Sequence, residues 1–226
     1  MVCTPLSARF TALFGTNALP PIIHVMNLYP CMLRRDEIKI DELTAEPLGP
    51  GYFQGYEARQ QFALGKLNSS IVDTFEPIKQ DTIVHCFSCA NWSSHELLAW
   101  ILSQTGPAEV LISVWSISEE AARQLIGMLN VGVITELTAV VDYRAKNRHP
   151  SAYQLAQHSF SRLETMPCHA KVTVIQNAEW QIVMNLSSNY TNNPRPEAGF
   201  ISSEPKTVEF YREIIFKMLS RSKPFE

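Results

Sequence analysis

Two pairs of polar residues stand beside apolar runs in the C-terminal third of the chain: His169 with Lys171, and Ser187 with Asn189. Each run has the character of a β-strand, and residues two positions apart on a strand point to the same side. If the two strands form a hairpin, the imidazole, ammonium, hydroxyl and amide groups come together in one patch. Such a patch suits phosphodiester cleavage, because an imidazole can attack phosphorus or protonate a leaving oxygen while the other groups hold phosphate oxygens.

A His-x-Lys pair alone has little meaning, because three-residue patterns arise by chance and a histidine at a strand start is usually a surface or interior residue. The longer pattern is more specific. In chain order it reads His169-x-Lys171, Ser187-x-Asn189 and then Glu197. It resembles the C-terminal half of the phospholipase D superfamily motif, in which the His-x-Lys strand leads to a Gly-Ser-x-Asn turn and then to a Glu. The similarity covers residues 168–201 in detail and roughly 82–220 in element order.

The resemblance implies a role for each residue of the pattern. His169 would be the nucleophile or its general-acid counterpart, Lys171 and Asn189 would bind phosphate oxygens, Ser187 would add a hydrogen bond, and Glu197 would orient a histidine. Family sites hold two copies of the motif and this chain has one, so the resemblance implies a homodimer whose two His169 side chains face each other. No metal or other cofactor is implied.

Two positions depart from the family pattern. Gln176 stands where the family has an Asp that supports the site, and Leu186 stands where it has the turn glycine before Ser187. These departures keep an alternative function open, a catalytically inactive relative that binds nucleic acid or assembles with other proteins.

A basic cluster follows the predicted strand at 134–142, at the edge where ligands bind in sheets of this kind. Its members are Arg144, Lys146, Arg148 and His149. Arg144 and Arg148, joined by Arg195, are candidates to bind the phosphates of a nucleic acid, although a solvated loop is the alternative interpretation. Nearby aromatic residues are candidates for stacking on bases, but aromatics at strand ends more often pack in the core. They are Phe87, Trp92, Trp115 and Trp180.

Other titratable residues are weaker candidates. Cys86 and Cys89 form a Cys-x-x-Cys beside His85, but no second pair completes the four ligands of a structural zinc site. His95 and His158 fall in predicted helices, where surface or capping roles are more common than catalysis.

Composition limits the class of partner. The net charge is −3 and the sequence pI about 6.1, so no overall positive field attracts nucleic acid, and any polyanion must be bound locally. The odd set of five cysteines predicts reduced thiols in a cytoplasmic protein. No segment has the roughly 20 apolar residues of a membrane span, and we therefore favour nucleic acid over lipid as substrate. Small single-motif relatives resemble proteins of phages and mobile elements.

The elements that must position the site follow from periodicity. Residues 1–50 are rich in proline and predict an irregular arm with one strand near 22–27, and residues 51–226 predict the phospholipase D-like domain. Strands are expected at 82–87, 109–115, 134–142, 170–175 and 180–186, and helices at 55–67, 93–103, 118–129, 150–164 and 207–219. This alternation predicts an α/β fold with a phospholipase D-like mixed, mostly parallel β-sheet, flanked by helices on both faces.

Overall fold

The computed structural model of the protein describes residues 58–66, 69–89, 92–192 and 195–220. All of them belong to one unit, Tyr56–Glu226. The predicted arm at 1–50, with its strand at 22–27, lies outside the described residues. The division of the chain into an arm and a domain therefore stays a prediction.

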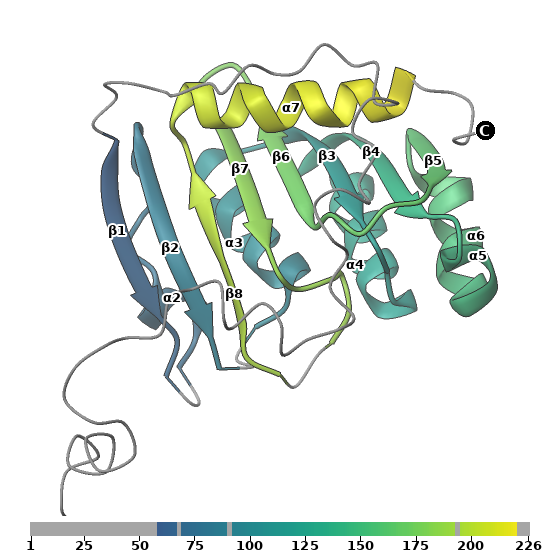
Figure 1. Cartoon of the computed structure of the whole chain (residues 1–226), viewed down its shortest axis with the longest axis horizontal. Coiled ribbons are helices and arrows are strands. Elements are labelled where there is room, and N and C mark those ends of the chain that lie inside the picture. Colours follow the sequence, from purple (N-terminus) through teal and green to yellow (C-terminus); the bar gives the residue numbers. More distant parts are fainter. Residues whose placement is uncertain (1–57, 67–68, 90–91, 193–194, 221–226) are drawn as a thin grey trace, which may run out of the picture. The chain divides into compact units, whose positions relative to one another are not determined.

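The described strands form one mixed sheet of eight strands in the order β1-β2-β8-β7-β6-β3-β4-β5 (Figure 1). In chain order they are β1 Arg59–Leu64, β2 Thr82–Ser88, β3 Ala108–Val114, β4 Ile134–Asp142, β5 Arg162–Met166, β6 Val172–Gln176, β7 Gln181–Leu186 and β8 Glu197–Ser202. The pairs β1–β2, β3–β4 and β4–β5 are parallel, and the pairs joining β2, β8, β7, β6 and β3 are antiparallel. Six of these strands run in one direction and only β6 and β8 run against them, which confirms a mixed sheet, although four of its seven pairings are antiparallel.

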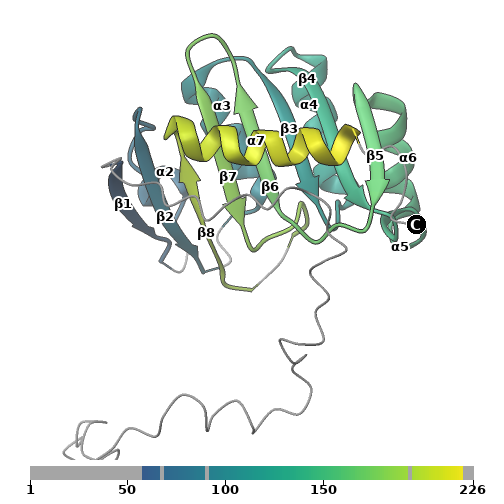
Figure 2. The same ribbon diagram turned by 45° about the horizontal axis from the view of Figure 1, so that its top comes forward.

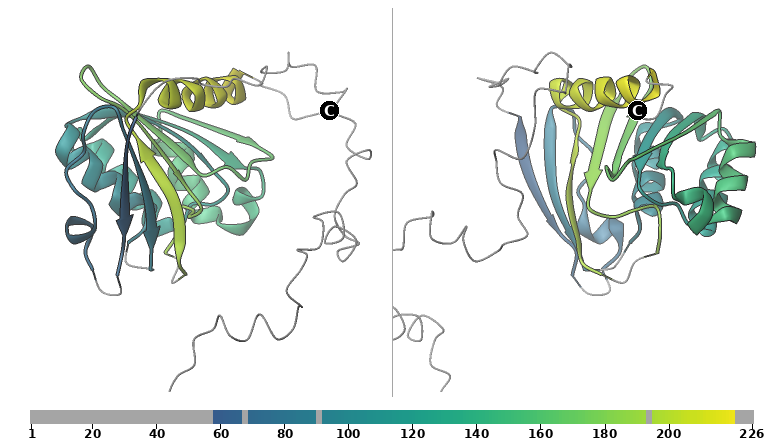
Figure 3. Two further views of the ribbon diagram at one scale, coloured as in Figure 1. Left: turned by 60° about the vertical axis from the view of Figure 1, so that its left-hand side comes forward. Right: turned by 45° about the vertical axis from the view of Figure 1, so that its right-hand side comes forward.

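Helices cover both faces of the sheet, as predicted. They are α2 Ile71–Thr74, α3 Ser94–Thr105, α4 Glu119–Asn130, α5 Ala145–Arg148, α6 Pro150–Ser159 and α7 Pro205–Ser220. Helix α7 crosses one face, and α3, α4 and α6 lie on the other (Figures 2 and 3). Each face has its own apolar cluster, one containing Leu97 and Leu125 from α3 and α4, the other containing Val208 and Ile215 from α7. The α/β fold class is therefore confirmed.

Several chain segments meet at one edge of the sheet, the edge formed by the carboxyl ends of the strands that share one direction. Strands β2, β3, β4 and β7 end at this edge, and the reversed strands β6 and β8 begin there. Because β6 and β8 are reversed, the residues that precede these two strands lie beside the residues that follow β3 and β7. Both predicted polar pairs belong to these segments.

Two predicted helices are wrong in part. Within the helix expected at 55–67, Arg59–Leu64 forms strand β1, because Ala63 is buried while its neighbours Phe62 and Leu64 point outward, and the segment pairs with β2. The helix expected at 150–164 ends at Ser159. Arg162–Met166 instead forms β5, which pairs in parallel with β4.

Helix ends follow the local sequence. Ser93 caps α3 in a capping box with Glu96, and the Ser118 side chain accepts from the Ala121 N–H at the start of α4. Gly132 follows α4 with φ of 74°, a conformation that favours glycine.

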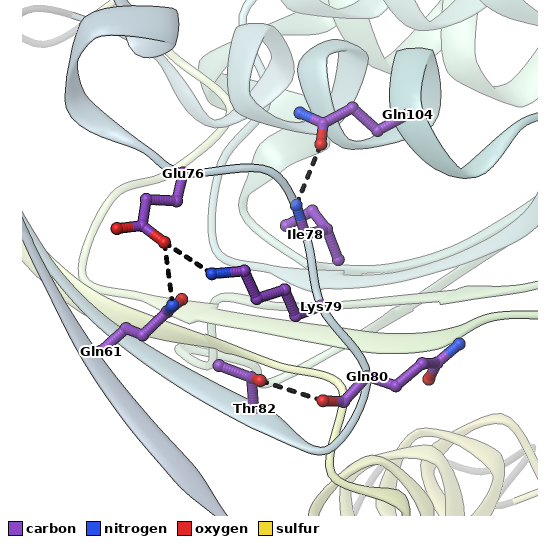
Figure 4. Close-up of polar contacts among 7 residues, drawn as sticks. All are labelled: Gln61, Glu76, Ile78, Lys79, Gln80, Thr82 and Gln104. Atoms are coloured by element: carbon purple, nitrogen blue, oxygen red, sulfur yellow. Dashed lines mark hydrogen bonds and ion pairs between the residues drawn. The ribbon is translucent and has the colours of Figure 1, made fainter.

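At the edge opposite the polar pairs, the connection from α2 to β2 is fixed by side chains (Figure 4). Glu76 accepts from Gln61 of β1 at 3.2 Å and pairs with Lys79 at 2.7 Å. The Ile78 N–H donates to Gln104 of α3 at 3.0 Å. These contacts attach the start of β2 to both β1 and α3.

Across the described ranges, no helix is both long enough and apolar enough to cross a membrane.

Candidate active site

The structure places the five residues of the sequence pattern at one edge of the sheet. His169 and Lys171 immediately precede β6, Ser187 and Asn189 immediately follow β7, and Glu197 is the first residue of β8. Strand β7 lies between β6 and β8 in the sheet, so the three segments are neighbours (Figure 1).

His169 and Lys171 contact each other directly. The Nζ atom of Lys171 lies 3.2 Å from His169 Nδ1 and donates to the His169 carbonyl oxygen at 2.8 Å. An ammonium group has donors and no acceptor, so Nδ1 of a neutral imidazole must be the acceptor and Nε2 must hold the ring proton. His169 itself is exposed. In this tautomer, Nε2 of His169 is an N–H group that can donate a hydrogen bond.

Lys171 also interacts electrostatically with Glu197, the last residue of the pattern. Burial lowers the pKa of Lys171 below its ordinary value, while electrostatic interactions with Cys168 and with the Glu197 carboxylate oppose that shift. The charge of Glu197, at the start of β8, therefore acts on Lys171, which precedes β6.

Ser187 and Glu197 form a second contact. The Ser187 hydroxyl donates to the Glu197 carboxylate and accepts from the Ala198 N–H at 3.0 Å. The Ser187 N–H donates to the Ala198 carbonyl at 2.8 Å, which extends the β7–β8 ladder by one residue. Glu197 thus holds Ser187 within this chain, and its expected role in orienting a histidine stays a prediction.

The turn after β7 is fixed by helix α3. The Ser94 hydroxyl lies 2.7 Å from the Ser188 hydroxyl and donates to the Asn189 carbonyl at 3.2 Å. Ser188 is buried, whereas Ser187 is exposed and Asn189 is half-buried. The Asn189 Oδ1 atom is buried without a hydrogen-bond partner within the described part of the chain. The backbone of Asn189 is therefore held by α3, while its side-chain oxygen can still accept a hydrogen bond.

The two departures from the family pattern have different structural consequences. Gln176 is the last residue of β6 and lies at the sheet edge opposite His169, away from the other residues of the pattern. Leu186 packs in the core, and its ladder partner is Gly199 of β8. A Cβ atom on Gly199 would lie only 2.7 Å from Leu186 Cα. The close approach of β7 and β8 at this point therefore depends on glycine at position 199.

Asp142 at the end of β4 supports the approach to His169. Its buried carboxylate accepts from the Cys168 N–H at 3.1 Å and from Arg144 Nε at 2.6 Å. The side-chain hydrogen bond from Arg144 lowers the pKa of Asp142 to about 2, although burial opposes the shift. This role of Asp142 was not predicted from the sequence, in which the Asp-x-Arg spacing at a strand end was the available indication.

The basic cluster adjoins the same patch through Trp115, which directly follows β3. The Trp115 and His169 ring centroids are 5.7 Å apart. Arg148 Cζ lies 4.9 Å from the Trp115 centroid, and Arg144 Cζ lies 6.0 Å from it. Arg195 is exposed in the segment before β8. The structure therefore brings Arg144 and Arg148 to the His169 side of the site.

The remaining candidates lie elsewhere or have other partners. Cys86 is buried, and burial raises the pKa of its thiol to about 12, whereas the adjacent His85 is exposed and stacks on Phe62. Their side chains point to opposite faces of β2. His95 is buried with its Nε2 3.1 Å from the Ser93 hydroxyl, in keeping with a role at the helix cap, and His158 is exposed.

No model of a known protein family matches the sequence, and no curated protein matches it. A crystal structure of polyphosphate kinase from Porphyromonas gingivalis is similar to this chain, with a TM-score of 0.47 and 13% sequence identity. The similarity covers 63% of this chain and 26% of the kinase chain, so this chain spans about a quarter of that protein.

Proposed function

We propose that the chain is a phosphodiesterase of the phospholipase D type, a metal-independent nuclease that works through a phosphohistidine. The observation that carries this proposal is the contact of Lys171 Nζ with His169 Nδ1 beside the linked Ser187 and Glu197. The four groups occupy one exposed edge of the sheet. They include an imidazole, a cation and a hydroxyl, which are the groups that phosphoryl transfer needs.

In the proposed reaction, Nε2 of one imidazole attacks phosphorus and forms a P–N bond while the P–O bond to the leaving group breaks. The imidazolium of a second His169 gives its proton to the leaving oxygen. Water then attacks the phosphohistidine, loses its proton to that second imidazole and releases a phosphate monoester. Lys171 and Asn189 would hold the phosphate oxygens throughout.

Substrate binding would prepare the nucleophile. When the His169 ring is neutral, a Lys171 ammonium 3.2 Å from Nδ1 favours the tautomer with the proton on Nε2, which leaves Nε2 without a free lone pair. A phosphate that draws the Lys171 ammonium away would free Nδ1 to take the ring proton. Nε2 would then be ready to attack.

The second His169 would come from another copy of this chain. The pattern occurs once in the sequence, and the proposed reaction needs two imidazoles. A two-fold dimer would supply them symmetrically, because each copy presents the same exposed edge. Nucleic-acid phosphates on either side of the cut would be bound by Arg144, Arg148 and Arg195.

The alternative function is an inactive phosphate-binding or assembly protein. The Lys171–His169 contact favours this alternative if it persists when phosphate binds, because Nε2 of the histidine then keeps its proton. The lysine would then serve as a phosphate anchor and the histidine would never become a nucleophile. Turnover separates the two functions.

The decisive experiment is a nuclease assay on single-stranded and duplex oligonucleotides with excess chelator. The unchanged chain is compared with His169→Asn and with His158→Asn, a matched control on the exposed face of α6. We expect His169→Asn to reduce turnover by roughly three orders of magnitude or more, and His158→Asn to leave it unchanged. Absence of cleavage by a folded dimer would refute the enzyme, and a monomer at micromolar concentration would refute the shared site.

A further inference from the structure

Trp115 differs from the other tryptophans of the chain. Trp92, Trp100 and Trp180 pack against the apolar core on the α3 and α4 face, and Trp115 belongs to neither core cluster. It is half-buried, directly after β3, with its ring beside His169. A ring that packs in neither core cluster and lies beside His169 is a candidate residue for contact with a ligand.

The groups over the Trp115 ring are cations that a ligand can replace. Arg148 Cζ is 4.9 Å from the ring centroid, and within the described residues Arg148 has no ion pair. Arg144 is more distant at 6.0 Å, and its charge is engaged by Asp142 at 2.6 Å. An exposed cation–π contact of this kind is weak, so Arg148 can move aside for a flat ring while its charge remains at the site.

We propose that Trp115 is a stacking subsite for a nucleobase next to the cleaved phosphate, with Arg148 binding the following phosphate. The inference rests on the proposed function and names the substrate class more closely, as single-stranded nucleic acid. One sugar separates a base from its phosphate, and the Trp115 ring lies 5.7 Å from the His169 ring, so one nucleotide can reach both. Bases in a duplex are already stacked on each other and cannot use the Trp115 face.

The charges around Trp115 favour a nucleobase over a cationic lipid headgroup. A quaternary ammonium would bind the same ring face by cation–π attraction, but it would meet the charges of Arg148 and Lys171. A neutral base attached to an anionic phosphate meets no such repulsion. Stacking also suits a chain of net charge −3, because it adds affinity that depends little on salt.

The test measures binding separately from cleavage. In the His169→Asn background, fluorescence anisotropy compares a short oligothymidylate with an abasic oligomer of the same length and charge. We expect the base-containing oligomer to bind roughly tenfold more tightly, and Trp115→Leu to remove that difference without weakening the abasic oligomer. Trp115→Phe should retain most of the preference. Trp180→Leu, in the hairpin at the opposite edge, should change neither affinity.

The outcomes separate the subsite from the proposed function. Equal affinity for the two oligomers would overturn the subsite even if the unchanged chain cleaves DNA. A base preference that depends on Trp115, in a chain without nuclease activity, would support the subsite and refute the enzyme. Failure to bind either oligomer, or Trp115-dependent binding to phosphatidylcholine vesicles, would overturn nucleic acid as the ligand.

Discussion

Replacing Asp142 by asparagine should cost stability in a way that depends on pH. The side chain is 1% exposed and accepts hydrogen bonds from Arg144 and from the Cys168 N–H. Arg144 holds the pKa of the folded carboxyl at about 2, against an ordinary value of 3.8. Because this pKa is lowered on folding, the stabilisation is full above about pH 5 and is lost as pH falls toward 2.

The magnitude follows from the two pKa values. Their difference corresponds to about 2 kcal/mol of unfolding free energy at pH 7, falling to about 1 kcal/mol at pH 3. The asparagine side chain would keep the shape of the aspartate and one acceptor oxygen, so the change reports mainly the lost charge. The assay is urea unfolding of wild type and Asp142→Asn at pH 7, 5 and 3.

A matched control is available on the neighbouring strand. Arg162 and Glu164 also form an ion pair between residues two apart, with 3.1 Å between Nη2 and Oε1, but both side chains are nearly half exposed. Glu164→Gln should cost at most about 1 kcal/mol at any of these pH values. If the Asp142→Asn difference is the same at pH 7 and pH 3, or no larger than that of Glu164→Gln, the reasoning about the buried pair is refuted.

Three further predictions concern the site edge. Gly199→Ala should lower the unfolding free energy by about 1–3 kcal/mol because the new Cβ meets backbone, whereas Gly127→Ala, with open space in α4, should raise it by about 0.5–1 kcal/mol. Ser94→Ala should cost about 1–2 kcal/mol in the same unfolding measurement, through lost bonds to the turn after β7. Long-range ¹H–¹⁵N NMR spectra should show the neutral His169 ring protonated at Nε2, and Lys171→Met should weaken this bias; a ring protonated at Nδ1 in the unchanged chain would contradict the contact.

The central elements could be predicted from the sequence because their local patterns agree with their environment. Residues 137–142 of β4 are mostly apolar because this part of the strand is buried on both faces, and Ser93 and Ser118 mark helix starts through their side chains. Segments at the sheet margin were harder. The two outermost strands of the sheet are Arg59–Leu64 and Arg162–Met166, and each pairs with one neighbour. That pairing makes them strands, and it cannot be read from the local sequence.

The grouping of the candidate residues could be predicted from the sequence, but the contacts between them could not. Spacing placed His169 with Lys171, and the hairpin prediction placed Ser187 nearby. The strand β8 was not predicted, because Glu197–Ser202 is short and contains Gly199, so the hydrogen bond of Ser187 with Glu197 was not foreseen. The Asp142 contact with Cys168 joins residues 26 positions apart and depends on the parallel pairing of β4 with β5.

The pairing of Leu186 with Gly199 limits which residues this part of the sheet can accept. The atoms nearest to a Cβ at position 199 would be the Asn185 carbonyl oxygen and the Leu186 Cα, so the restriction comes from the backbone of β7. Position 199 should therefore remain glycine among related chains whatever side chain stands at position 186.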